Sequence, residues 1–272
     1  MATSAPENAY VLDTAAKAGQ ERLNAQHMVL QSILDNRYLV APLKSPPKIL
    51  LELGTGTARV HPDCRVIGVD IVDAIGENPP PNFEFRTLDI TSDDWGFTEK
   101  FDVIHSRLLC TVQMDWRKLV AKIFDHLKPG GYVEMKEVQF PIQCDDNSWE
   151  TNGMKDFYVS WDQGIKKLGL DWFVTPKLPD LLKNGGFLDV DKIKVMLRAG
   201  TWGDTDKDKE DGRLFAVAQY VHPMLFLVPL TKGLGWTEEE AQAKVKETYE
   251  GLLTGNMHVY TNFFAMWGRK PE

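Results

Sequence analysis

The stretch Lys48-Ile-Leu-Leu-Glu-Leu-Gly-Thr-Gly-Thr-Ala58 decides the fold of this chain. Its apolar run, residues 49–51, predicts a buried strand that ends in the acidic Glu52 and continues into the glycine-rich turn of residues 54–57. A second apolar run follows after a short link and ends in Asp70. Two parallel strands, with a glycine turn after the first and a carboxylate after the second, are typical of a doubly wound fold that binds a nucleoside. The sequence therefore predicts an enzyme with a nucleoside cofactor.

Length and composition narrow the class of protein. The chain has 272 residues, of which 43% are hydrophobic, so it can form one large α/β domain with insertions or two small domains. It has no apolar run of about 18 residues and no apolar leader at the start, which argues against a membrane span and a signal peptide. A net charge of −8 without a basic block disfavours general nucleic-acid binding.

The cysteines indicate a reducing compartment. Cys64, Cys110 and Cys144 are odd in number, widely spaced and free of any Cys-x-x-Cys pair. This pattern argues against a disulfide framework and against a structural zinc site, and we expect no bound metal.

Strands and helices alternate through the first half of the chain. We expect strands at residues 49–52, 66–69, 83–88, 101–106 and 132–137, a helix at 13–38 before the prolines 42, 46 and 47, and a helix at 116–127 that is stopped by the turn 128–131. Strand, connection and strand in this order predict a mostly parallel sheet that is covered on both faces.

The second half is less regular but contains no repeat and no obvious linker. We expect helices at residues 149–168, 176–184, 213–228 and 238–253 and strands at 187–197 and 257–268. The mixed-charge run 204–211 reads as a solvated loop. We therefore expect a single domain over residues 1–272, with a helical cap at 1–47, a cofactor-binding half at 48–140 and an acceptor half at 141–272.

Several residues near the predicted strand ends are candidates for cofactor contact. Gly54 and Gly56 let the backbone approach a ligand closely, although the same residues suit an ordinary tight turn. Asp70 can accept hydrogen bonds from both ribose hydroxyls, and the alternative is a strand-end cap or a salt bridge. Asp89 follows the third strand and can accept a hydrogen bond from the exocyclic amine of adenine. The alternative is that this aspartate caps a turn. Ile71 and Ile90 would then enclose the adenine ring, and Ser106 and Arg107 would lie beside the amino-acid part of the cofactor.

These residues belong to a wider set of motifs. The set comprises Tyr10 with Glu21-Arg22-Leu23 and Gln26-His27, Leu51-Glu-Leu-Gly-Thr-Gly-Thr57, Val66-Ile-Gly-Val-Asp70, Pro80-Pro-Asn82 with Phe85, Asp89 with Trp95, Phe101-Asp-Val-Ile-His-Ser-Arg107, and Leu127-Lys-Pro-Gly-Gly-Tyr132 with Glu134. Through them, residues 8–137 resemble class I S-adenosylmethionine-dependent methyltransferases. Within that class, the chain resembles the LaeA-like fungal secondary-metabolism group.

The resemblance implies a fold, a cofactor and a lid. The fold is α/β, a doubly wound, Rossmann-like sheet of seven strands with the last strand antiparallel, and the cofactor is S-adenosyl-L-methionine. The N-terminal helix would close over the cofactor, and segments 149–175 and 204–230 would form a lid over the acceptor. The predicted cofactor-binding residues are Tyr10, Arg22, His27, Glu52, Gly54, Gly56, Asp70, Ile71, Asp89, Ile90, Ser106 and Arg107.

The chain departs from this family in the link between its first two strands. The third glycine of the usual turn is Ala58, and only residues 58–64 stand where the family has a helix of several turns. Pro62 inside this segment would cost a helix about 3 kcal/mol. We therefore expect a shortened or absent crossover helix, with at most about two turns. The cofactor could still bind, the fold could serve a chemistry with little need of it, or the chain could be a variant with a damaged site.

Methyl transfer needs alignment first, and a base only where the acceptor must lose a proton. The predicted catalytic histidines are His222, in an aromatic insert, and His105, at the end of the fourth strand; His27 and His258 are weaker candidates. Each of them is also readily explained as a structural or surface histidine.

The aromatic side chains of the predicted lid suit an apolar small molecule, and they equally suit a hydrophobic core. The sequence thus predicts a methyltransferase that acts on a small secondary metabolite. The alternatives are a LaeA-like regulator that acts through a protein partner, and an enzyme of this fold that catalyses cyclisation or isomerisation. We expect a cytoplasmic protein, with the nucleus as the alternative location.

Overall fold

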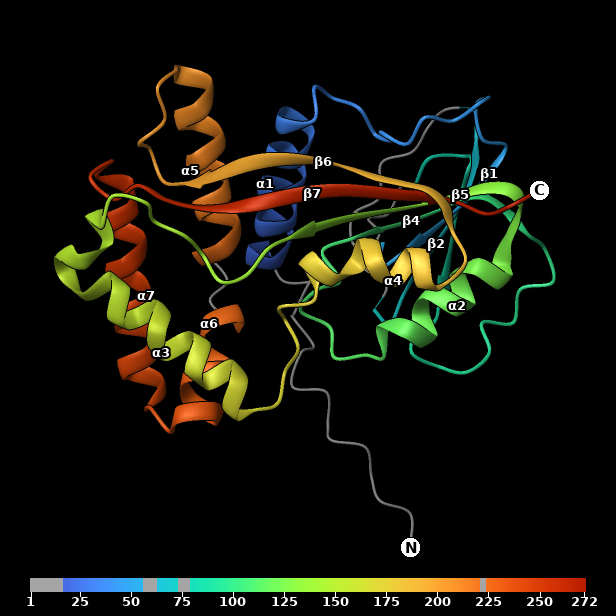
Figure 1. Ribbon diagram of the computed structural model, residues 1–272. Coiled ribbons are helices and arrows are strands. Elements are labelled where there is room, and N and C mark those ends of the chain that lie inside the picture. Colours follow the sequence, from blue (N-terminus) through green and yellow to red (C-terminus); the bar gives the residue numbers. More distant parts are fainter. Residues whose placement is uncertain (1–16, 56–62, 73–78, 221–223) are drawn as a thin grey trace, which may run out of the picture. The chain divides into compact units, whose positions relative to one another are not determined.

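The computed structural model describes residues 17–55, 63–72, 79–220 and 224–272 (Figure 1). The chain divides into two compact units. The helical unit comprises Met1–Asp35, Pro141–Asp171 and Met196–Thr261, and the sheet unit comprises Asn36–Phe140, Trp172–Val195 and Asn262–Glu272. The single domain that the sequence predicts stays a prediction.

The seven strands form one sheet in the order β3-β2-β1-β4-β5-β7-β6. Strands β1 to β5 are parallel to their neighbours, whereas β7 runs antiparallel to β5. This arrangement confirms the predicted doubly wound α/β fold. The strands are β1 Ile49–Leu53, β2 Arg65–Asp70, β3 Phe83–Thr87, β4 Phe101–Arg107, β5 Leu127–Val138, β6 Leu188–Ala199 and β7 Val259–Arg269.

Helices cover one face of the sheet in the sheet unit. Helix α2 (Trp116–His126) begins where the Asp115 side chain accepts hydrogen bonds from two backbone N–H groups, and it buries an apolar stripe that includes Leu119 and Ile123. Helix α4 (Leu178–Asn184), which follows the short turn η2 (Thr175–Lys177), packs beside α2 (Figure 1). Because side chains alternate along a strand, this face carries the apolar residues Leu51, Leu53, Ile67, Ile104, Val133 and Met135.

An extended segment, residues 36–43, covers the opposite face, and we call it the strap. It packs Tyr38, Leu39, Val40, Ala41 and Leu43 onto a cluster of buried side chains from the sheet. No helix or strand is assigned within it. The buried members of this cluster are Ala41, Leu50, Cys64, Val66, Val103, Tyr132 and Trp267.

The link between β1 and β2 begins as a tight turn. The backbone N–H groups of Gly54 and Thr55 both donate to the carbonyl oxygen of Val69, at 2.9 and 3.1 Å. The Thr55 side chain is fully buried over Gly68, where an added Cβ would lie 2.4 Å from Thr55 Oγ1. The prediction of a shortened crossover helix concerns residues 58–64, of which 58–62 lie outside the described residues, so it stays a prediction.

The helical unit has its own core. Helix α1 (Lys17–Ile33) packs on α5 (Asp206–Tyr220), and α3 (Met154–Lys167) packs on the π-helical turn η3 (Pro229–Gly233). The Trp161 indole is buried there and donates to the Leu225 carbonyl at 2.8 Å. The remaining helices of this unit are η1 (Ser148–Gly153), α6 (Met224–Val228) and α7 (Glu238–Leu253).

Two local predictions are wrong. The mixed-charge run 204–211 is not a loop, because α5 begins at Asp206. The Thr205 hydroxyl donates to Asp208 Oδ2 and accepts from the Asp208 N–H, so the pair caps the helix start. Helix α2 does end just before residues 128–131, as expected, but these residues belong to β5 rather than to a separate turn, and the Gly130 N–H donates to the carbonyl oxygens of Lys270 and Pro271. By contrast, α7 matches its prediction and carries a capping box at Thr237.

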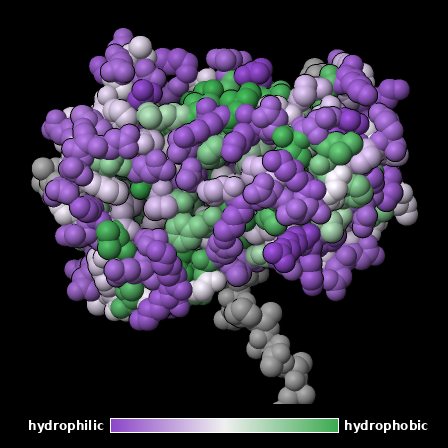
Figure 2. Space-filling model, in the orientation of Figure 1, coloured by the Kyte–Doolittle hydropathy of each residue, from purple (hydrophilic) through white to green (hydrophobic). Residues whose placement is uncertain are grey.

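The surface is mostly hydrophilic on the face that Figure 2 shows, with apolar patches between the polar side chains. Within the described parts of the chain, no helix is both long and apolar enough to cross a membrane.

Candidate functional site

Four parallel strands of the sheet unit end at one edge of the sheet. The register pairs Leu53 of β1 with Val69 of β2 and with Ser106 of β4, and it pairs Asp70 of β2 with Thr87 of β3. Ligands of doubly wound sheets bind at this edge, beyond the carboxyl ends of the strands. The predicted residues Gly54, Asp70, Asp89 and Ser106 follow or end these strands, so the fold brings them to the same edge.

The turn after β1 favours glycine at its first position. Gly54 has a φ of +67°, in the left-handed region. A Cβ added there would lie 2.7 Å from Leu109 Cδ2, so the Leu109 side chain would have to shift. The turn therefore presents bare backbone beside the strand end. Gly56 lies outside the described residues.

Asp70 is half-buried at the end of β2. Its Oδ1 accepts from the backbone N–H of Ile71 at 2.8 Å, and its carbonyl oxygen accepts from the Leu88 N–H at 2.9 Å. The carboxylate thus caps the end of the strand, which was the sequence-based alternative to ribose binding. The next side chain, Ile71, is 47% exposed.

Asp89 is exposed in the loop after β3 and caps a turn. Its Oδ1 accepts from the backbone N–H and the hydroxyl of Thr91, at 2.8 and 2.7 Å. The side chain of Ile90 is buried, and its carbonyl oxygen accepts from the Trp95 indole at 3.0 Å and from Lys122 Nζ at 2.8 Å. The turn-capping alternative is therefore observed, and Lys122 of α2 fixes the loop.

Ser106 is 1% exposed near the end of β4. Its Oγ has no hydrogen-bond partner among the residues that the structure describes. An unpaired buried hydroxyl costs on the order of 1–3 kcal/mol, so it is an unusual feature at a strand end. Arg107 beside it is half-buried.

Glu52 and His105 do not lie at the open edge, because they are buried beneath the strap. The two residues are paired across β1 and β4, and each is 2% exposed. The Tyr38 hydroxyl donates to Glu52 Oε2 at 2.7 Å, while His105 Nδ1 lies 3.6 Å from Glu52 Oε1. The imidazole lies against the Tyr38 ring, with centroids 5.3 Å apart.

Burial sets the charge states of this trio. It lowers the pKa of His105, which outweighs the opposing effect of Glu52 and keeps the imidazole neutral. Burial raises the pKa of the Glu52 carboxyl, but contacts with His105, Arg107 and Tyr38 together bring it below its ordinary value. The Tyr38 pKa is raised by burial and by Glu52, so its hydroxyl remains a donor.

A second buried pair holds the strap backbone. Glu134 of β5 is fully buried, and its Oε2 accepts from the N–H groups of Val40 and Ala41 at 2.8 and 2.7 Å. Lys136 Nζ lies 3.1 Å from Glu134 Oε1 and donates to the Tyr38 carbonyl oxygen. The two pairs together attach the strap to β1, β4 and β5.

The remaining predicted residues lie elsewhere. Arg22 and His27 are buried on α1 in the helical unit, so their contribution to a cofactor site stays a prediction. Tyr10 and His222 lie outside the described residues. The predicted catalytic roles of His105 and His222 are likewise untested and remain predictions.

The sequence did not reveal an aspartate–histidine pair in the helical unit. His258 Nδ1 lies 2.5 Å from Asp146 Oδ2, and the imidazole lies against Trp202 with centroids 5.2 Å apart. The two partners are 112 positions apart, so no local pattern could have linked them.

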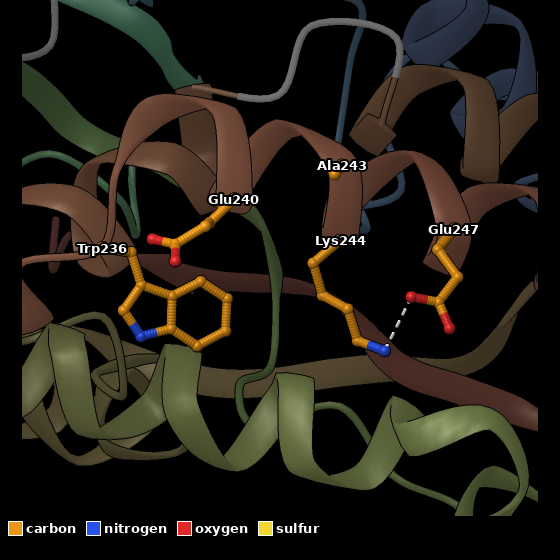
Figure 3. A pocket seen from close by; sticks show the side chains of 5 residues that line it. All are labelled: Trp236, Glu240, Ala243, Lys244 and Glu247. Atoms are coloured by element: carbon orange, nitrogen blue, oxygen red, sulfur yellow. Dashed lines mark hydrogen bonds and ion pairs between the residues drawn. The ribbon is translucent and has the colours of Figure 1, made fainter.

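A hollow of about 400 Å³ lies along α7 in the helical unit (Figure 3). Lys244 forms an ion pair with Glu247 at 2.8 Å, and both side chains line the hollow. None of its five lining residues was predicted to bind cofactor or acceptor. They are Trp236, Glu240, Ala243, Lys244 and Glu247.

The strand order and the antiparallel β7 define a Rossmann-like methyltransferase fold. A family profile described as a methyltransferase domain matches residues 25–174, which is more than half of the chain. The chain therefore belongs to the methyltransferase domain family, as the sequence predicted.

Relatives of this chain include two fungal proteins. Methyltransferase pytC of Aspergillus terreus is 27% identical over 268 residues, which cover 94% of this chain and 82% of that protein. Secondary metabolism regulator LAE1 of Cochliobolus heterostrophus is 26% identical over 272 residues, which cover 93% and 87%. A solved structure of phosphoethanolamine N-methyltransferase 2 from Haemonchus contortus, in complex with S-adenosyl-L-methionine, has a TM-score of 0.45 at 15% identity, covering 92% of this chain and 53% of that one.

Proposed function

We propose that this chain transfers a methyl group from S-adenosyl-L-methionine to a small secondary metabolite. The observation that carries the proposal is the clustering of Gly54, Asp70, Asp89 and Ser106 at one edge of the sheet. Bare backbone at Gly54 and the buried hydroxyl of Ser106, which has no hydrogen-bond partner in the described part of the chain, fit a polar ligand there.

Each residue has a separate task in this proposal. The turn at Gly54 lets the chain approach the ligand, and Asp70 accepts hydrogen bonds from ribose hydroxyls. Asp89 caps its turn through Oδ1, and its second carboxylate oxygen can accept a hydrogen bond from the adenine amine. The exposed Ile71 offers an apolar surface to the ring, and Ser106 offers its hydroxyl to the amino-acid part.

The cofactor supplies the methyl group and a neutral thioether as leaving group when it is bound. The protein therefore needs chiefly to align the acceptor with that methyl group and to keep water out. An acceptor that must lose a proton would need a base as well, and His222 keeps that role as a prediction.

Calorimetric titration with S-adenosylmethionine tests the cofactor. We expect micromolar binding by the full chain that is abolished in Asp70→Ala and unchanged in Asp180→Ala. Asp180 lies on α4, and its side chain is 79% exposed, so it serves as the matched control. A well-folded chain that shows no heat of binding would refute the proposal.

The relative named as a secondary metabolism regulator favours a second candidate, a role exerted through a protein partner. Methyl-labelled S-adenosylmethionine separates the two functions when it is incubated with the chain and a cell extract. Label in a small molecule other than S-adenosylmethionine, absent when the chain is left out, supports the metabolite enzyme, and label that the chain adds only to protein supports the second candidate. The cytoplasmic location, with the nucleus as the alternative, stays a prediction that fluorescent tagging would test.

A further inference from the structure

Glu137 of β5 is a buried acid that the proposed cofactor contacts do not use. Its side chain is fully buried, and burial raises the pKa of the carboxyl to about 7. An apolar residue would occupy this position at a lower cost in free energy. The carboxyl group therefore needs a structural explanation.

The explanation lies in the segment after β4. Glu137 Oε1 accepts from the backbone N–H of Leu109, and Oε2 accepts from that of Cys110, both at 3.0 Å. The preceding residue, Leu108, has a φ of +56°, which costs a residue other than glycine about 1 kcal/mol. The two hydrogen bonds to Glu137 hold the chain directly after this strained residue.

The segment held by Glu137 contacts the glycine turn. Leu109 is 5% exposed, and its Cδ2 occupies the space that a Cβ on Gly54 would need. On its other side, the turn is held by the two hydrogen bonds from Gly54 and Thr55 to Val69. Leu109 is therefore the packing support of the turn, and Glu137 fixes Leu109.

We propose that Glu137 is a positioning residue for the cofactor-binding turn and acts on Gly54 through Leu109. This inference rests on the proposed function, because it assigns Glu137 to the site that would hold S-adenosylmethionine. Glu137 does not touch the cofactor itself. It sets where the backbone of the turn lies.

The test combines ligand binding with amide exchange on the full chain. Glu137→Gln keeps one acceptor oxygen but places an amide NH₂ against a backbone N–H, so one of the two hydrogen bonds is lost. We expect the Kd for S-adenosylmethionine to rise about tenfold, because a tenfold change in affinity corresponds to the loss of roughly one hydrogen bond. Hydrogen exchange of the Gly54 and Thr55 amides should become faster in the same variant.

A second variant separates positioning from general damage. Leu109→Ala removes the contact with Gly54 but leaves Glu137 in place. If both residues act in one chain of contacts, the double variant binds S-adenosylmethionine no more weakly than the worse single variant. Additive losses would show independent effects and overturn the proposal.

The pH dependence of S-adenosylmethionine affinity is a further test, because a residue that only stabilises the fold would not alter it. Among the described residues, the titratable group that interacts with Glu137 is the Cys110 thiol, whose pKa burial raises well above its usual value, so it stays neutral. Because the ionised carboxylate is the better acceptor, wild-type affinity should fall as the pH drops from 8 to 6. Glu137→Gln should show no such change.

The outcomes also separate this proposal from the proposed function. If the wild-type chain does not bind S-adenosylmethionine, the proposed function fails, and amide exchange still reports on the turn. Unchanged protection of Gly54 and Thr55 in Glu137→Gln would overturn the positioning role, whether or not the cofactor binds.

Discussion

The two faces of the sheet are covered in different ways. One face packs against the helices α2 and α4 through apolar side chains such as Ile123, which is fully buried. The other face packs against the strap, and it contains the buried charged groups of Glu52, Glu134 and Lys136. The difference follows from the backbone of the covering segment.

A helix satisfies its own backbone hydrogen bonds, so only its side chains need to match the sheet. An extended strap lacks the regular internal hydrogen bonds of a helix, although the Leu43 N–H donates to the Ala41 carbonyl oxygen within it at 2.8 Å, so its other buried N–H and C=O groups need partners elsewhere. Glu134 supplies the acceptor for Val40 and Ala41, and Lys136 supplies the donor for Tyr38. The charged groups beneath the strap thus replace the hydrogen bonds that a helix would have made internally.

The largest effect is expected for Glu134→Leu. This change removes the acceptor of two strap N–H groups and leaves Lys136 buried without its carboxylate, so unfolding free energy should fall by about 4 kcal/mol. Urea denaturation of the full chain measures it. Glu84→Gln is the control, because Glu84 pairs with Arg65 on the surface and should lose less than about 1 kcal/mol.

Should Glu134→Leu not fold, Glu134→Gln keeps an acceptor for the strap and is expected to lose about half as much. A loss no greater than that of the Glu84 control would mean that the strap needs no buried carboxylate. The comparison between the two faces would then fail.

On the helical face, Ile123→Ala should reduce the unfolding free energy by about 3 kcal/mol through lost burial and a cavity. Because the change itself removes no ionisable group and no hydrogen bond, and Glu137 of β5 is left in place, this loss should not change between pH 6 and pH 8. Denaturation curves at both values measure it. A loss that varied with pH would show that the helical face also depends on charge.

The smallest effect is expected for Tyr38→Phe. The change removes the hydroxyl that donates to Glu52 at 2.7 Å and leaves a buried carboxylate oxygen without that donor. We expect a loss of about 2 kcal/mol in unfolding free energy. Tyr132→Phe on the same face provides a matched comparison, and equal losses in both variants would argue against a special role for the hydroxyl of Tyr38.

Much of the fold follows from local patterns in the sequence. The five parallel strands were predicted within a few residues, except at the start of β5, because continuous apolar runs mark buried strands. The acid-rich start of α7 marked that helix correctly. The start of α5 was missed, because the same acids that begin the helix also read as a solvated charge run.

The candidate site was predicted unevenly. Gly54, Asp70, Asp89 and Ser106 follow strand ends, and parallel strands bring such positions to one edge, so their clustering could be expected. The burial of Glu52 could not, because it depends on Tyr38 and on a strap that carries no periodic signal. The support of Gly54 by Leu109 joins positions that are 55 residues apart, and only their distance in the folded chain reveals it.

The sequence alone determined where the parallel strands end and which polar residues follow those ends. Apolar runs and glycine turns are local properties, so they can be read without the fold. Tertiary structure alone decided which acids remain at the open edge and which are buried. That choice depends on what covers each face, because an extended covering segment needs buried hydrogen-bond partners, which Glu52 supplies to the Tyr38 hydroxyl and Glu134 supplies to the strap backbone. The motif around Gly54 therefore indicates the family, whereas Tyr38, Leu109 and Glu137 determine how the residues around that motif are packed.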